Sequence, residues 1–408
     1  RMRAPMMDIH TVAAGGGSVC SYRDGRFQVG PESAGADPGP ASYRRSGPLT
    51  VTDCNLLLGA LSADYFPAVF GVSGNMPLDL DAARSKAEEL SSQNGLQGTL
   101  EEMAQGFLEI AVQNMANAIK KISVERGHDI TTYTLQSFGG AGGQHACLVA
   151  EALGMSRVMV HPFAGVLSAY GMGLADVRCL REGQLDCDLE DEVQVQASLD
   201  SLQTAVTHEL ATQGIACPRI ETMAHLRYEG SHQALEVAFS TATQMAQDFE
   251  TAHIARFGFS SPDRKLQFEM LSVEAIGEVS GAANPQISFG DGHPVGHSKL
   301  YRQGWYDTKV YDRTTLHPEQ VIDGPAIILE PTGTNVVELG WQVQQDAFGN
   351  LILEHVAQPV RDLASSKADP ILLEVMSNRF MSIADQMGAT LANTSWSVNI
   401  KERFDFSC

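Results

Sequence analysis

The chain has 408 residues, of which 43% are hydrophobic and 19% charged, and its formal net charge is −21 at pH 7. This length exceeds what one hydrophobic core usually organises, so we expect two or more domains. The negative charge repels phosphate backbones, which argues against nucleic acid as a partner. No apolar run approaches the roughly 18 residues of a membrane span, so we expect a soluble protein without a membrane partner.

The seven cysteines and the two ends of the sequence carry further information. The cysteines are widely spread and form no Cys-x-x-Cys pair, a pattern typical of reduced thiols in a cytoplasmic protein. The sequence begins at Arg1, opens with no signal peptide and stops at Cys408, directly after the dense run KERFDFSC. Both ends are therefore expected to be internal to a longer polypeptide.

Residues 1–50 are rich in glycine and proline, and the short β-type runs within them predict strands linked by tight loops. A short helix is expected over 53–61, with Asp53 as its N-cap. A longer amphipathic helix is expected over 99–127, because Thr99 opens a capping box and apolar residues recur at helical spacing.

The next segment alternates between strand and helix patterns. Its predicted elements are a strand over 133–138, a glycine loop over 139–143, a helix over 144–153, a strand over 157–161 and a helix over 165–175. This order is typical of an open α/β sheet.

The character of the sequence changes after Val177, and a smaller α+β domain is expected from there to residue 356. Its predicted elements are a helix over 193–213, a hairpin of 221–228 with 234–239, a helix over 242–257, a strand around 268–279, and short strands at 326–329, 335–337, 342–345 and 351–354. The last four form a β-rich end that should complete this domain as a barrel-like cap. A polar linker over 357–369 and an amphipathic helix over 370–392 follow.

Four glycines in five positions make the run SFGGAGGQH the sharpest local motif. They are Gly139, Gly140, Gly142 and Gly143. Glycines let a backbone pass within contact distance of a ligand and leave its amides free to donate, which suits a nucleotide phosphate or ribose. The run matches neither the dinucleotide fingerprint nor a P-loop, which needs a lysine. The alternative is a tight turn from strand to helix without a ligand.

A second glycine segment follows two ionisable residues near the start of the chain. Alternation places Asp8 and His10 on one face of a predicted strand that runs into this glycine turn. Two such side chains beside exposed amides could orient a substrate or act as acid and base, and the alternative is a structural hydrogen bond. Ser18 could donate its hydroxyl to a phosphate or only cap the turn. The segment consists of Gly15, Gly16, Gly17 and Ser18.

Five runs resemble the hydantoinase A/oxoprolinase family in their order and spacing. They are MDIHTVAAGGGS, VGPESAGADPGPASY, TVTDCNLLLGAL, FGGAGGQHACLVAEALGM and AGVLSAYGMGLADV. Two later runs resemble the beginning of the hydantoinase B family, namely SNRFMSIADQMG and NIKERFDFSC. The resemblance divides the chain into the C-terminal part of an A-type actin-like domain over 1–178, an A-type C-terminal α+β domain over 179–356, the linker over 357–369 and the start of a B-type domain over 370–408.

The resemblance implies an actin-like ATPase fold for the A-type part, where ATP with Mg²⁺ phosphorylates the amide oxygen of 5-oxo-L-proline. The B-type part would complete ring opening to L-glutamate, and the full-length parent would form a homo-oligomer, a dimer. In this scheme Asp8 and His10 are catalytic, and no metal ligand is identified. The cofactor-binding residues would be Gly15, Gly16, Gly17, Ser18, Gly139, Gly140, Gly142 and Gly143.

Two other functions compete with this one. An ATP-dependent hydantoinase or a ketone carboxylase subunit would share the scaffold, but the fusion of A-type and B-type segments argues against both. The chain also contains no Asp-x-Gly-Gly-Thr phosphate loop of the kind the family carries. That absence favours the second alternative, a non-catalytic assembly module.

Overall fold

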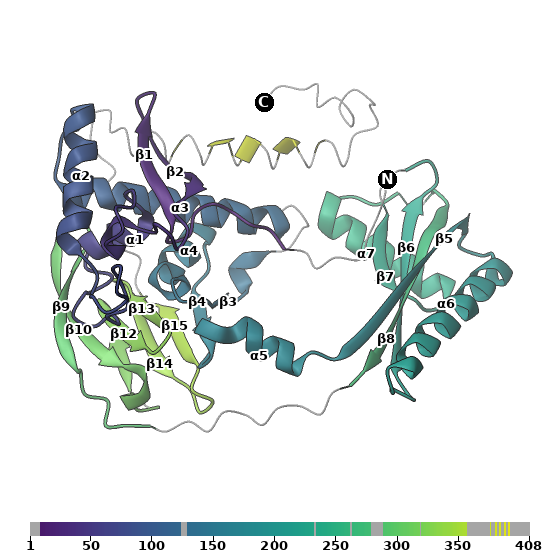
Figure 1. The fold of residues 1–408 in the computed structure, drawn as a ribbon. Helices are drawn as coiled ribbons and strands as arrows, with labels where there is room; N and C mark the ends of the chain where they lie inside the picture. Colours follow the sequence, from purple (N-terminus) through teal and green to yellow (C-terminus); the bar gives the residue numbers. More distant parts are fainter. Residues whose placement is uncertain are drawn as a thin grey trace.

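The fold is that of a computed structural model, which describes residues 9–123, 129–231, 234–261, 263–278, 289–318 and 320–356 and eight helical positions between 376 and 391. Two separate hydrophobic cores divide these residues into two bodies (Figure 1). The first core draws on residues 14–164 together with 311–353. The second core draws on residues 179–275, so the second body is inserted into the sequence of the first.

The first body begins with an antiparallel hairpin and three helices that pack on one another. They are β1 (Ser18–Arg23), β2 (Arg26–Ser33), α1 (Val51–Leu57), α2 (Leu80–Asn94) and α3 (Leu100–Ile122). The capping box predicted at Thr99 is present, with Glu102 as its partner, because both side chains satisfy amides of the first turn. The helix α3 ends at Ile122 rather than near Gly127, which lies outside the described residues.

Asp53 has a different role from the predicted one. The N-cap of α1 is Thr50, and Asp53 is the third helical residue, whose side chain completes the capping box. Its buried carboxylate accepts hydrogen bonds of 2.8–3.0 Å from the amides of Ala41, Ser42 and Thr50 and from the Thr50 hydroxyl. Burial raises the pKa of Asp53, and hydrogen bonds from Ser42 and Thr50 act in the opposite direction. The loop before α1 is therefore fixed to the helix through one side chain.

We expect Asp53→Asn to lower the free energy of unfolding by about 2–3 kcal/mol, because the amide replaces one acceptor with a donor that faces other donors. Urea unfolding followed by circular dichroism would measure the loss. The matched control is Asp191→Asn at the N-cap of α6 (Glu192–Thr212), where asparagine caps as well as aspartate. Equal stabilities of the Asp53 variant and the wild type would contradict the prediction.

A five-stranded mixed sheet joins distant parts of the chain in the order β11-β14-β15-β4-β3. Its strands are β3 (Leu135–Ser137), β4 (Arg157–Val160), β11 (Val321–Asp323), β14 (Trp341–Gln345) and β15 (Leu351–His355). The strands β3 and β4 are parallel, as the alternation of strand and helix predicted, and β15 pairs antiparallel with β4. The last two strands of the predicted β-rich end thus extend the sheet that β3 and β4 begin.

This pairing differs from the predicted grouping of residues 179–356 in one domain with the β-rich end as its cap. The strands of that end exist as predicted, but β15 pairs with β4 and β14 with β15, while the two strands before them join another sheet of the first body. The physical reason is that Val158 and Val160 of β4 are almost fully buried, so this strand needs a hydrogen-bonded partner on each side. Local sequence patterns identify a strand but not the edge to which it pairs.

A second sheet of the first body has the order β13-β12-β10-β9 (Figure 1). Its strands are β9 (Gly296–Tyr301), β10 (Trp305–Asp312), β12 (Ala326–Glu330) and β13 (Gly333–Val337). The strands β12 and β13 form a hairpin, and β12 runs parallel to β10. This hairpin lies against the glycine loop that follows β3.

The second body is a four-stranded antiparallel sheet whose core α6 and α7 help to fill (Figure 1). Its order is β5-β8-β6-β7, with β5 (Val177–Asp188), β6 (Arg219–Tyr228), β7 (Leu235–Ala238), α7 (Ala242–Phe257) and β8 (Leu266–Gly277). The helix α7 and the hairpin of β6 and β7 were predicted. The long strand β5 was not, since glycine and charged residues interrupt its pattern.

Two short helices, α4 (Ala146–Leu153) and α5 (Leu167–Leu174), follow β3 and β4. The helix α4 is largely buried, whereas no residue of the apolar α5 is buried and Met172 is 80% exposed. None of the helices in the described ranges is long and apolar enough to cross a membrane. The described positions within the predicted helix over 370–392 are helical, while the linker over 357–369 and the run NIKERFDFSC lie outside the described residues.

Candidate functional site

The two glycine segments lie side by side although more than a hundred residues separate them. One is the turn of Gly15–Gly17 before β1, and the other is the loop of Gly139–Gly143 between β3 and α4. A Cβ atom placed on Gly16 would lie 3.9 Å from the Cβ of Ala141. Both segments were predicted from the sequence as candidates for ligand binding, and the fold places them at one site.

The helix α1 connects the two segments through two residues one turn apart. Thr52 donates to the Gly16 carbonyl from its amide at 2.9 Å and from its hydroxyl at 3.0 Å. Asn55 donates from Nδ2 to Oε1 of Gln144 at 2.8 Å, and the same nitrogen lies 3.4 Å from Nε2 of His145. Residues three apart on a helix share a face, so one face of α1 holds both segments. Neither Thr52 nor Asn55 was identified from the sequence, where they read as ordinary helix residues.

Several backbone amides at this site have no hydrogen-bond acceptor among the described residues. They belong to Gly16, Gly17, Gly140 and Ala141. Gly140 is exposed and the other three residues are half-buried. Neighbouring amides that point to no protein acceptor are suited to bind an anion or a ribose oxygen. The donors that a nucleotide would require are therefore available here.

The identity of most loop glycines follows from packing within the protein. A Cβ atom on Gly140 would lie 2.9 Å from the Thr332 carbonyl, and one on Gly142 would lie 2.9 Å from the Ser137 hydroxyl. A Cβ atom on Gly143 would overlap Oδ1 of Asn335. Gly139 differs, because its φ of +86° favours glycine and a Cβ atom there would meet nothing within 4 Å. Of the four glycines, only Gly139 has open space where a Cβ atom would lie.

His145 is a buried and uncharged histidine directly behind the loop. It is 3% exposed and precedes the first residue of α4. Burial, and secondly the charge of Arg302, lower its pKa to about 4. The ring is therefore neutral near pH 7, which suits its position beside Nδ2 of Asn55.

This histidine makes stability depend on pH. Its pKa is near 6.5 in the unfolded chain and about 4 in the folded one, so between these values the unfolded state binds more protons. The stability contribution of neutral His145 is full above about pH 6.5 and falls by up to about 3 kcal/mol as the pH drops toward 4. We expect His145→Gln to lose less stability than the wild type between pH 7 and 4.5, as measured by urea unfolding. The exposed His208→Gln is the control, and parallel curves for His145→Gln and wild type would contradict this assignment.

The predicted pair Asp8 and His10 is only partly within the described residues, because Asp8 lies outside them. His10 is exposed. The predicted strand through these residues is absent over 9–12, and β1 begins only at Ser18. A tight turn from the Ala14 amide to the Val12 carbonyl at 3.0 Å interrupts the extended backbone before the ladder starts. Ser18 itself is buried at the start of β1, paired with Ser33.

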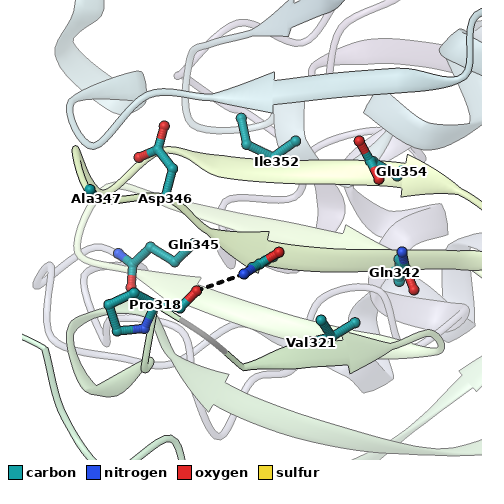
Figure 2. A pocket seen from close by; sticks show the side chains of 9 residues that line it. Pro318, Val321, Gln342, Gln345, Asp346, Ala347, Ile352 and Glu354 are labelled. Carbon is teal, nitrogen blue, oxygen red and sulfur yellow. Dashed lines mark hydrogen bonds between the residues drawn. The ribbon is translucent and has the colours of Figure 1, made fainter.

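Two cavities lie away from the glycine segments. One, of about 310 Å³, lies over β11, β14 and β15, with Pro318, Val321 and Ile352 in its lining (Figure 2). The other, of about 240 Å³, is lined by residues of the second body such as Tyr228 and Arg264. Neither is lined by the amides described above, so we place the candidate site by its hydrogen-bonding groups rather than by cavity size. Within the described ranges no group of three or more His, Cys, Asp or Glu residues could hold a metal ion.

Three family descriptions match the chain. Hydantoinase/oxoprolinase matches residues 1–181, the hydantoinase/oxoprolinase C-terminal domain matches residues 285–356, and hydantoinase B/oxoprolinase matches residues 369–408. The first two stretches are those that meet in the first body. The chain therefore belongs to the hydantoinase/oxoprolinase family, with A-type and B-type segments in one polypeptide.

Among its relatives are proteins named 5-oxoprolinase. The chain is 36% identical to the 5-oxoprolinase of Saccharomyces cerevisiae, 37% to that of Dictyostelium discoideum and 38% to 5-oxoprolinase 1 of Arabidopsis thaliana. Each alignment covers 100% of this chain and 34% of the relative. The chain thus spans about a third of the length of these relatives.

Two solved structures share the fold. The ATP-dependent caprolactamase from Pseudomonas jessenii superposes with a TM-score of 0.74 at 30% identity, over 86% of this chain and 54% of that one. The nucleotide-free acetone carboxylase superposes with a TM-score of 0.63 at 22% identity, over 85% and 52%, which shows the fold alone. These likenesses confirm the predicted fold class, a part of the hydantoinase-type actin-like ATPase fold.

Proposed function

We propose that the protein takes part in the ATP-dependent hydrolysis of 5-oxo-L-proline to L-glutamate. The observation that carries the proposal is that α1 holds two glycine segments together and gathers amides without acceptors at one place. The names of the relatives supply the chemistry, since several are called 5-oxoprolinase and a solved neighbour is an ATP-dependent caprolactamase. Both names describe the opening of a cyclic amide.

In this proposal the amides of Gly140 and Ala141, with those of Gly16 and Gly17, bind the nucleotide. Phosphorylation of the lactam oxygen by ATP turns an unreactive amide into one whose C–N bond water can break. Mg²⁺ would accompany the phosphates, because this ion is usually held by one or two carboxylates together with the nucleotide rather than by a protein cage. The loop fits this role, since its amides remain available as donors.

Asp8 and His10 are proposed to orient the substrate or the transferring phosphate. A group that acts mainly in the transition state affects turnover more than nucleotide affinity. We expect His10→Ala to lower kcat by about 10²-fold or more and to leave the KM for ATP unchanged, as is typical of a lost acid or base. Nearly wild-type turnover in His10→Ala would show that Asp8 and His10 have a structural role instead.

The test of the proposed function is a substrate panel on the whole protein encoded by the gene and on residues 1–408. Substrate-dependent ADP release would be measured with 5-oxo-L-proline, hydantoin, caprolactam and acetone. We expect release with 5-oxo-L-proline from the whole protein. Release only with caprolactam would favour the second candidate, a larger lactam, which the caprolactamase likeness supports. No release from the whole protein with any substrate would favour a non-catalytic assembly module.

Location and assembly complete the proposal. We place the protein in the cytoplasm because its seven cysteines lack paired spacing. We propose a homodimer because α5 is apolar and none of its residues is fully buried, and exposed apolar surface of this kind tends to be covered by a partner. Sedimentation equilibrium of the whole protein would decide between monomer and dimer.

A further inference from the structure

The hairpin of β12 and β13 packs against the glycine loop. The Thr332 carbonyl at its turn lies close to Gly140, and the Thr332 side chain leaves no room for a Cβ atom on Gly165, just after β4. Three residues further on, in β13, the Asn335 side chain leaves no room for a Cβ atom on Gly143. The hairpin therefore contacts the loop at its tip and near its end.

The orientation of the Asn335 amide is fixed by a neighbouring charge. Its Nδ2 atom donates to Oε1 of Glu330 at 2.5 Å, and the same oxygen accepts from Nη1 of Arg313. A carboxylate can only accept, so Asn335 must present its NH₂ group to Glu330 and its carbonyl oxygen to Gly143. Asn335 is 4% exposed, and the Arg313 and Glu330 side chains are 7% and 4% exposed.

Arg313 extends this network to the other end of the loop. Its guanidinium donates to the carbonyls of Val160 at 2.7 Å, His161 at 3.1 Å and Gly349 at 2.8 Å. The segment that begins at His161 carries the Ala164 carbonyl, which accepts from the Gly139 amide at 2.8 Å. The first glycine of the loop is thus held through Ala164, and the last is held against Asn335.

A buried ion pair is costly to desolvate and is weak evidence for stability alone, so its placement calls for another role. Here it fixes both ends of a loop whose central amides, of Gly140 and Ala141, have no acceptor among the described residues. Fixing donors before a ligand arrives reduces the ordering cost of binding. We propose that Asn335, oriented by Glu330 and Arg313, is a positioning residue that holds the glycine loop in its nucleotide-binding conformation.

This inference rests on the proposed function, and its test has one readout that does not depend on it. The variant is Asn335→Ala, which removes the contact to Gly143 and leaves the pair of Glu330 and Arg313 in place. The control is Asn94→Ala at the end of α2, away from this network, where the Asn94 amide donates to the Leu90 carbonyl at 2.9 Å. Both variants would be made in the whole protein encoded by the gene.

The first readout is hydrogen exchange of the peptide spanning residues 138–145, without nucleotide. We expect Asn335→Ala to speed its exchange about tenfold and Asn94→Ala to leave it unchanged, because only the first loosens the loop locally. Equal exchange in Asn335→Ala and wild type would overturn the inference whatever the protein catalyses.

The second readout is the KM for ATP in substrate-dependent ADP release. We expect a rise of about tenfold, equivalent to about 1.4 kcal/mol of binding, with kcat within twofold of wild type. Faster exchange with an unchanged KM would overturn the link to nucleotide binding, and an equal fall in kcat would point to general damage and overturn it too. A wild-type protein that is inactive with every substrate would refute the proposed function. The hydrogen-exchange result would still test whether Asn335 positions the loop.

Discussion

Replacing Arg313 with methionine is expected to lower the free energy of unfolding by about 3–5 kcal/mol, because the change leaves the Glu330 carboxylate buried without its cation. The change also removes the donor to the carbonyls of Val160 and His161, which lie at the end of β4. Unfolding in urea, followed by circular dichroism and by tryptophan fluorescence, would measure the loss. Both probes should report the same transition if the first body unfolds as one unit.

The matched control for this change is Arg157→Met. Arg157 pairs with Glu354 at 2.6 Å across β4 and β15, but the two side chains are 56% and 42% exposed. Exposed pairs contribute about 0–1 kcal/mol, so this variant should be nearly as stable as the wild type. Adding Glu330→Leu to Arg313→Met should recover part of the stability, since it removes the unpaired charge. Equal losses in the variants of Arg313 and Arg157 would contradict the assignment of a buried network.

Replacing Gly143 with valine is expected to abolish ATP binding, with at least a hundredfold loss of affinity. The new Cβ atom would overlap Oδ1 of Asn335 and lie 2.9 Å from the Thr334 carbonyl, so the loop must move away from the hairpin. Inserting atoms into a packed contact costs about 1–3 kcal/mol, so the fold should survive at reduced stability. Calorimetric titration of ATP into the whole protein would measure the affinity, with circular dichroism as the check on folding.

The matched control is Gly171→Val in α5, where a Cβ atom would meet nothing within 4 Å. This variant should bind ATP as the wild type does. An unchanged affinity for ATP in Gly143→Val would show that the loop is not part of the nucleotide site. If Gly143→Val does not fold, Gly143→Ala takes its place in the titration. The alanine Cβ atom still overlaps Asn335, but the side chain adds fewer atoms.

Local elements were predicted where one short-range interaction dominates. The capping box of Thr99 and Glu102 starts α3 as expected, and α7 has the bounds that its pattern indicated, because caps and helical periodicity act within a few residues. Asp53 was placed in the right helix but in the wrong role, since Thr50 competes for the cap position. The predicted strand through His10 was wrong over residues 9–12, because the tight turn at Ala14 stops the ladder.

The sequence by itself determined the family, the order of strands and helices around the glycine loop, and the two glycine segments as candidates for ligand binding. These depend on motifs and periodicities that a linear chain carries in full. Only the tertiary structure decided that β15, the last strand of the β-rich end, pairs with β4, that Thr52 and Asn55 join the two glycine segments, and that Asn335 supports Gly143. Each of these is a contact between residues far apart in sequence, whose partners are chosen by burial and by hydrogen bonds that no local pattern encodes.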